Sequence, residues 1–301
     1  MEKIIILKVN SLFLKIKRQK IQDYLTQLWV SVGGREITPL REAWLIGPLG
    51  KVNGIGKEFV YQLAKEENLI IEESSSSKGL LSSIKDLNLS TDELTQLDKD
   101  IIDFYEYTSD YDVLFSLKWN PLFKCFGFLV GKLFSNRINQ LNIPANNISQ
   151  DQIIDNQIIH LISPDNKEVK HTIWFRTFKN SDTVLYSGIY STCSIPSGKT
   201  CIKAVFPLPN GSATVILSPE VGSNGELILN SKGKQFGEAG FYFLLKNLKE
   251  EYRSKYISTF HDRLVVYKKD NDLGAIQNLK LWHLNVLTIQ YKLSRRKELV
   301  R

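Results

Sequence analysis

The sequence predicts an α+β protein in which a helical N-terminal half precedes a strongly curved antiparallel β-sheet or β-barrel. In the first half, apolar residues recur mainly at the three-to-four-residue spacing of helices. After Asp151, about ten short runs rich in β-branched and aromatic residues alternate with turn residues. A sheet with that many strands tends to curl or close, because strands twist and open edges attract further pairing.

The same change of pattern predicts two regions. Residues 1–145 form a mostly helical region, with a flexible linker near residues 72–82, where a run of serines precedes Lys78 and Gly79. Residues 146–301 form the antiparallel β domain.

Three helices are expected before residue 120. A basic amphipathic helix spans residues 4–29 and ends at Gly33-Gly34, and a second helix spans residues 57–67. The glycine-rich loop before the second helix lacks the third glycine of a dinucleotide-binding fingerprint, because Phe59 stands there. Ser90 or Thr91 is expected to cap the third helix.

A fourth helix is predicted over residues 121–141. Asn120-Pro121 supplies a cap residue and a proline at the first helical position. Most sides of this helix are apolar, which is typical of a helix packed inside a protein, here on the sheet. The alternative is contact with a membrane surface, with Lys124 and Lys132 reaching the headgroups.

The β domain contains a strong hairpin signal at Ile195-Pro196-Ser197-Gly198. This loop would pair Cys193 directly with Cys201, at a separation that permits a disulfide. We expect both thiols to be reduced in the cell. The neighbouring Gly198-Lys199-Thr200 resembles the end of a phosphate-binding loop, but a strand follows it where that loop requires a helix.

Composition sets broad limits on location and partners. The chain has 301 residues and a formal net charge of +7, which is a mild excess, so we expect no nucleic-acid partner. The beginning of the chain lacks the features of a signal peptide, and no apolar run reaches the roughly 18 residues of a membrane-spanning helix. A cytoplasmic location is therefore expected.

Two strands carry candidate ligand-binding residues. Trp174, Arg176 and Phe178 alternate along one predicted strand and therefore share a face. His261 and Arg263 share a face of another. If these faces line a barrel, the cations suit an acidic group and the aromatic rings suit an apolar body. The alternative is that these faces point to solvent.

No known catalytic motif is recognisable, so the sequence leaves open whether the protein is an enzyme. Its four histidines do not show metal-ligand spacing, and we expect neither a metal nor a cofactor. The strand-rich half resembles lipocalin-like and other β-cup domains in general architecture. The first functional hypothesis is therefore non-enzymatic binding of a hydrophobic or acidic amphiphilic small molecule. The alternatives are a peripheral membrane or protein-interaction module, through helix 121–141, and an enzyme of unrecognised class.

Overall fold

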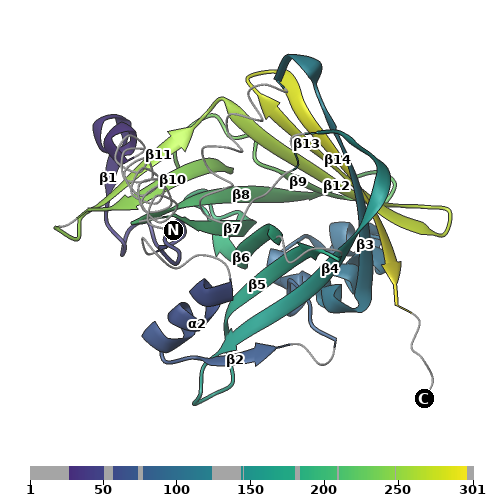
Figure 1. Cartoon of the computed structure of the whole chain (residues 1–301), viewed down its shortest axis with the longest axis horizontal. Helices are drawn as coiled ribbons and strands as arrows, with labels where there is room; N and C mark the ends of the chain where they lie inside the picture. Colours follow the sequence, from purple (N-terminus) through teal and green to yellow (C-terminus); the bar gives the residue numbers. More distant parts are fainter. Residues whose placement is uncertain are drawn as a thin grey trace, which may run out of the picture.

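A computed structural model describes residues 27–50, 57–73, 77–123, 144, 146–179, 184–208, 210–247 and 249–296. Its strands form one 14-stranded sheet (Figure 1). Ten of these strands, in the order β8-β7-β6-β5-β4-β3-β14-β13-β12-β9 and back to β8, close into an antiparallel barrel. The predicted curved antiparallel sheet is confirmed in the form of this closed barrel.

The barrel strands follow the chain closely. They are β3 (Tyr111–Trp119), β4 (Ile148–Ile162), β5 (Val169–Phe178), β6 (Val184–Ser194), β7 (Thr200–Leu208), β8 (Gly211–Val221), β9 (Leu227–Asn230), β12 (Phe260–Lys269), β13 (Asp272–Leu281) and β14 (Leu284–Arg295). Strands β3 to β8 pair consecutively, and β12 to β14 do the same. The short strand β9 closes the ring, because it pairs with β8 on one side and β12 on the other.

The sheet divides along β8. The first part of this strand, up to Ile216, pairs with β10 (Gly240–Lys246), and its end, from Ser218, pairs with β9. Strand β10 continues outward to β11 (Tyr252–Ile257) and β1 (Arg35–Ile37), while β2 (Ile70–Glu73) pairs with the end of β4. The barrel therefore carries a flap of three strands outside its wall (Figure 1).

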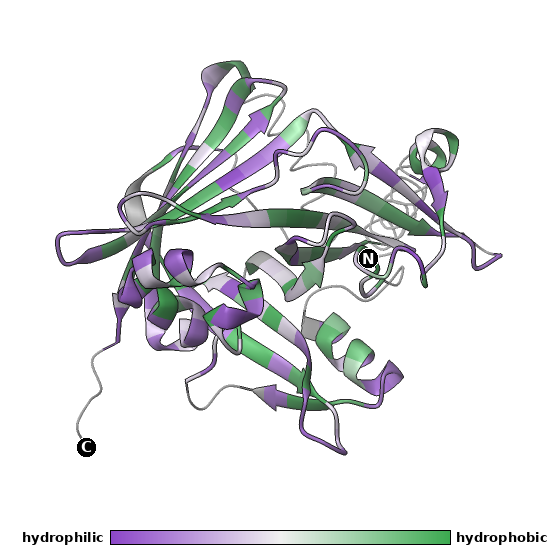
Figure 2. Cartoon of the chain, turned by 180° about the vertical axis from the view of Figure 1, so that it is seen from behind, coloured by the Kyte–Doolittle hydropathy of each residue, from purple (hydrophilic) through white to green (hydrophobic). Residues whose placement is uncertain are grey.

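Alternation of side chains explains the barrel wall. Along β3, buried positions alternate with more exposed ones, as expected for a strand with one face inward. The same alternation of hydrophilic and hydrophobic residues runs along several strands in Figure 2. The inward faces form the largest apolar core, whose fully buried members include Phe115, Ile154 and Leu227. Burial of these faces from water is the main stabilising force of the barrel.

Helix α2 (Lys57–Glu66) lies outside the barrel, against the outer faces of β4, β5, β6 and β7. Its Phe59, Val60 and Leu63 are buried in a separate core with Ile173 and Val205. This arrangement follows from the amphipathic spacing of the helix, which leaves one apolar stripe to cover.

A second helical group, which we call the plug segment (residues 77–110), covers an opening of the barrel. It contains η1 (Ile84–Leu87), α3 (Thr91–Gln96), α4 (Lys99–Glu106) and η2 (Thr108–Asp110). These elements contact β7, β8, β12 and β4 respectively. Strands β7 and β8 are neighbours, whereas β12 and β4 lie elsewhere around the ring. The plug segment therefore spans the opening, and its Leu81 and Phe104 belong to the barrel core.

Capping stabilises the first helix of the plug segment. Ser90 is the N-cap of α3, and it forms a reciprocal capping box with Glu93, as the sequence predicts. Because Leu97 then takes an extended conformation, the predicted single helix is divided into α3 and α4, and Asp98 caps α4.

Gly79 allows the plug segment to pack on itself. A Cβ atom at this position would lie 2.3 Å from the Tyr105 carbonyl oxygen and 2.4 Å from the Glu106 carbonyl carbon. We expect Gly79→Ala to lower the free energy of unfolding by about 1–3 kcal/mol, because backbone atoms must move apart. Urea unfolding measures this change. The exposed Lys85 in the same segment gives the control, since Lys85→Ala is expected to change stability by less than about 0.5 kcal/mol. Equal stability of both variants would contradict the tight packing at Gly79.

The structure corrects the prediction of a helical N-terminal half. Among the described residues before 146, the helices are short, and β1, β2 and β3 are strands. Strand β3 is part of the barrel wall, although it precedes residue 146, where the second region is predicted to begin. The predicted helix 121–141 begins with the short η3 (Pro121–Phe123), and its residues 124–141 lie outside the described residues. Most of the predicted helix 4–29 also lies outside them, with residues 27–33 helical.

The predicted hairpin between β6 and β7 is confirmed. Cys193 pairs with Cys201, and the Ile195 amide donates to the Lys199 carbonyl over 3.0 Å. Gly198 has a φ of +87°, the left-handed conformation expected at this loop position. The two thiols are unbonded, and burial raises the pKa of Cys201 to about 12. A thiol with so high a pKa is a poor nucleophile.

Candidate functional site

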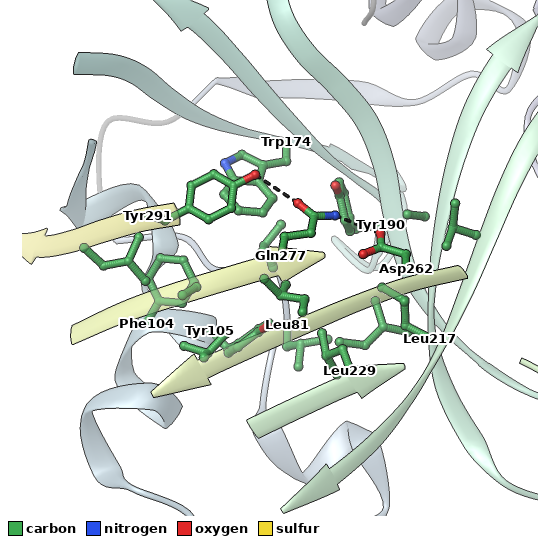
Figure 3. Close-up of a pocket in the computed structure, with 18 of the residues that line it drawn as sticks. Leu81, Phe104, Tyr105, Trp174, Tyr190, Leu217, Leu229, Asp262, Gln277 and Tyr291 are labelled. Atoms are coloured by element: carbon green, nitrogen blue, oxygen red, sulfur yellow. Dashed lines mark hydrogen bonds between the residues drawn. The ribbon is translucent and has the colours of Figure 1, made fainter. Parts of the chain in front are cut away.

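A cavity of about 80 Å³ lies inside the barrel beneath the plug segment (Figure 3). Its walls are mostly apolar. Side chains from the barrel strands and from the plug segment line it: Leu80, Leu81, Phe104, Tyr105, Val113, Trp174, Arg176, Tyr190, Ser191, Ile202, Ala204, Val215, Leu217, Leu229, Asp262, Leu264, Val266, Ala275, Gln277, Tyr291 and Leu293. A small number of polar groups therefore faces an apolar interior, as in many small-molecule sites.

Trp174 and Arg176 line the cavity from β5. The Arg176 guanidinium carbon lies 3.8 Å from the centre of the Trp174 ring, and one guanidinium nitrogen donates to the Tyr190 hydroxyl over 3.3 Å. Arg176 is only 5% exposed, so this cation–π contact is largely shielded from water. The sequence left two orientations open for this face of the strand, and in the structure Trp174 and Arg176 face inward.

Trp174 also connects the cavity to the plug segment. Its indole N–H donates to the Asn156 side-chain oxygen, and the Asn156 amide group donates to the Thr108 carbonyl over 2.8 Å. Since Asn156 and Thr108 are both buried, this chain of hydrogen bonds orients the indole ring beneath Arg176.

Phe178 shares the inward face of β5 but lies beyond the cavity. It packs against Phe115, with ring centres 5.7 Å apart, in the core of the barrel. Its position is therefore that of a packing residue next to the site.

The orientation considered for His261 and Arg263 needs correction. Asp262, which lies between them on β12, is buried and lines the cavity, whereas Arg263 is exposed. Because strand side chains alternate, His261 and Arg263 face the outside of the barrel. Leu264, Val265 and Val266 are all apolar, so the sequence of this strand does not distinguish its inner face from its outer one.

The inward Asp262 begins a buried chain of hydrogen bonds. The Gln277 side-chain amide donates to Asp262 Oδ2 over 2.8 Å, and the Tyr291 hydroxyl donates to Gln277 Oε1 over 3.0 Å (Figure 3). Asp262 is 6% exposed, and its Oδ1 accepts no hydrogen bond from the described residues. Burial raises the pKa of Asp262 from 3.8 to about 7, although the hydrogen bond from Gln277 acts in the opposite direction.

Arg176 and Asp262 occupy opposite walls. Strand β5 and strand β12 are five steps apart in either direction around the ten-strand ring. Both charges act on Tyr291. Burial raises the pKa of Tyr291 to about 12, while the positive charge of Arg176 lowers this pKa and the negative charge of Asp262 raises it. The cavity therefore presents a cation on one wall and a titratable carboxyl group on the other.

Asp262, Gln277 and Tyr291 were not among the predicted site residues. Each is polar on a strand rich in apolar residues, but adjacent residues such as Arg263 and Asn278 are polar too, so this pattern does not single them out. Their meeting depends on the register of β12, β13 and β14, in which Gln277 lies opposite Leu264 and Ala275 lies opposite Tyr291.

The fold and the cavity together define a class: a closed antiparallel β-barrel with an internal, mainly apolar cavity that contains a few polar groups. The chain is similar to the "Uncharacterized membrane protein YndJ" of Bacillus subtilis (strain 168), at 25% identity over 242 residues. The match covers 80% of this chain and 41% of YndJ, so the chain spans about two fifths of the length of that relative. No protein-family model matches the chain, and no solved structure matches it.

The described residues contain neither a metal-binding cluster nor a membrane-spanning helix. Within them, no cluster of three or more histidine, cysteine, aspartate or glutamate side chains has the geometry to hold a metal ion. None of the helices in the same residues combines the length and apolar character needed to cross a membrane.

Proposed function

We propose that the protein binds a small amphiphilic molecule inside the barrel and does so without catalysing a reaction on it. The observation that carries this proposal is the cavity of about 80 Å³, with its apolar lining and its inward Arg176 and Asp262. A few polar groups that face a mostly apolar interior are typical of small-molecule sites, and one of them, Asp262, has a carboxyl oxygen without a hydrogen-bond donor among the described residues.

The size of the cavity restricts the ligand. Pockets for drug-sized molecules measure roughly 300–1,000 Å³, so this cavity suits a small molecule or one end of a longer one. The ligand's apolar body would contact residues such as Val215, Leu217 and Leu264. An acidic end would face Arg176, whose guanidinium forms charge-assisted hydrogen bonds to carboxylates.

The proposal extends the general architecture of lipocalin-like β-cups, which enclose one ligand within the barrel. It also retains the cytoplasmic location inferred from the sequence.

A larger side chain in the cavity wall would test the proposed function. Ala275 lies on β13, is buried and lines the cavity. We expect Ala275→Leu to weaken binding of a small apolar acid such as isovalerate by at least about tenfold, because the added side chain occupies the ligand's space. Isothermal titration calorimetry measures the affinity, and native mass spectrometry of protein purified from its own cells reports a retained natural ligand.

Ile276→Leu is the matched control, because it places a leucine on the same strand but on the outer face. Its affinity for isovalerate should equal that of the unchanged protein. Absence of isovalerate binding by the unchanged protein, together with absence of a retained ligand, would overturn the proposed function.

A second candidate function is attachment to a membrane surface. The observation that favours it is the similarity to a longer protein whose name describes it as a membrane protein. The net charge of +7 suits an anionic surface. Sedimentation with vesicles of anionic and of neutral phospholipid tests this candidate: selective retention on anionic vesicles supports it, and equal absence from both rejects it.

A further inference from the structure

The Asp262 carboxyl group is a buried, only partly hydrogen-bonded group of the cavity wall. Its Oδ2 is held by Gln277 over 2.8 Å, and Gln277 is held in turn by Tyr291. Its Oδ1 is buried, accepts no hydrogen bond within the described part of the chain, and belongs to a side chain that lines the cavity. The structure therefore holds one carboxyl oxygen in place and leaves the second, buried oxygen without a hydrogen-bond donor from the described residues.

We propose that Asp262 holds a protonated amine of the bound molecule. The ligand is then a small zwitterion with an apolar hydrocarbon part and with its acidic group toward Arg176. This inference rests on the proposed function and names the ligand class of the same cavity. The two charges of such a ligand would match the opposite walls of the ring, and the apolar lining between them would enclose its hydrocarbon part.

An amine fits this position better than a neutral donor. The charged groups that line the cavity are Arg176 from β5 and Asp262 from β12, and the titratable tyrosines are Tyr105, Tyr190 and Tyr291. Burial raises the pKa of Tyr105 and of Tyr291, so both stay neutral at physiological pH. Arg176 lies on the far wall, and no ion pair joins it to Asp262 among the described residues. A ligand ammonium group is therefore the cation that would compensate the carboxylate.

A matched pair of probes tests the amine alone. 5-Aminovalerate and valerate share the same unbranched hydrocarbon and carboxylate, and only 5-aminovalerate carries an ammonium group, at the end of the chain away from the carboxylate. We expect 5-aminovalerate to bind at least about tenfold more tightly than valerate, as measured by isothermal titration calorimetry. In Asp262→Asn this preference should disappear while valerate still binds. In the outward-facing control Arg263→Gln the preference should remain.

The pH dependence gives a second readout. Because burial raises the pKa of Asp262 to about 7, the preference for 5-aminovalerate should be larger at about pH 8 than at about pH 5.5, where the carboxyl group is protonated. Valerate binding without any preference for 5-aminovalerate would overturn the inference and leave the proposed function intact. A preference that survives in Asp262→Asn would also overturn it. Failure of both probes to bind would count against the proposed function itself.

Discussion

Asp262→Asn is expected to raise the free energy of unfolding at pH 8 by up to about 4 kcal/mol more than it does at pH 4. Burial raises the pKa of this carboxyl group to about 7, whereas an aspartate in an unfolded chain has a pKa of about 3.9. Between these values the folded protein holds a proton that the unfolded chain releases. The neutral Asp262 carboxyl group therefore makes its full contribution to the stability of the unchanged protein below about pH 4. This contribution is lost as the pH rises through about 7.

The neutral amide of asparagine removes this cost, because it carries no charge to be buried. Urea unfolding of both proteins at several values between about pH 4 and 8 measures the effect. Asp272→Asn, an exposed change at the start of β13, is the control and should alter stability by less than about 0.5 kcal/mol. If the difference between Asp262→Asn and the unchanged protein does not grow with pH, the carboxyl group is solvated or paired in solution.

Arg176→Met is expected to weaken binding of an acidic ligand such as isovalerate by about 10- to 100-fold while the fold persists. Hydrogen bonds to charged groups contribute about 1.5–3 kcal/mol each, and methionine cannot form them. The methionine side chain retains much of the packing of the arginine stem against Trp174. Calorimetric titration with isovalerate gives the affinity, and urea unfolding shows whether the variant is folded.

Arg263→Met is the matched control, since this arginine is exposed on the outer face of β12. It should leave the affinity for isovalerate unchanged. If a folded Arg176→Met variant binds isovalerate as tightly as the unchanged protein, Arg176 does not anchor the acidic group. A loss of stability of about 3–5 kcal/mol in Arg176→Met would instead show that the guanidinium compensates a buried negative charge of the protein itself.

Local patterns predict much of the barrel. Strand β5 has the predicted bounds, and the hairpin that joins β6 to β7 has the predicted register, because a four-residue turn signal determines which residues pair. Local sequence patterns do not predict strand β3. Its alternating residues lie within a region of helical spacing, and its pairing partners β4 and β14 are distant in the sequence.

In the candidate site, too, some residues are predicted from local patterns and others depend on the pairing of distant strands. Trp174 and Arg176 were predicted because aromatic residues flank a cation on one face of an unambiguous strand. On β12, both faces carry apolar residues near the centre of the strand, so the choice between Asp262 and its neighbours His261 and Arg263 depended on the assembled sheet. The Asp262–Gln277–Tyr291 chain likewise forms only after β12, β13 and β14 are in register.

By itself the sequence determined the antiparallel strands, the β6–β7 hairpin with its paired cysteines, and the shared face of Trp174 and Arg176, since each depends on residues close together in the chain. Only the tertiary structure decided that the sheet closes, that the plug segment covers the cavity, and that Asp262 lies opposite Arg176. The physical reason is that closure and register are set by the combined burial of many distant side chains, which no short segment specifies.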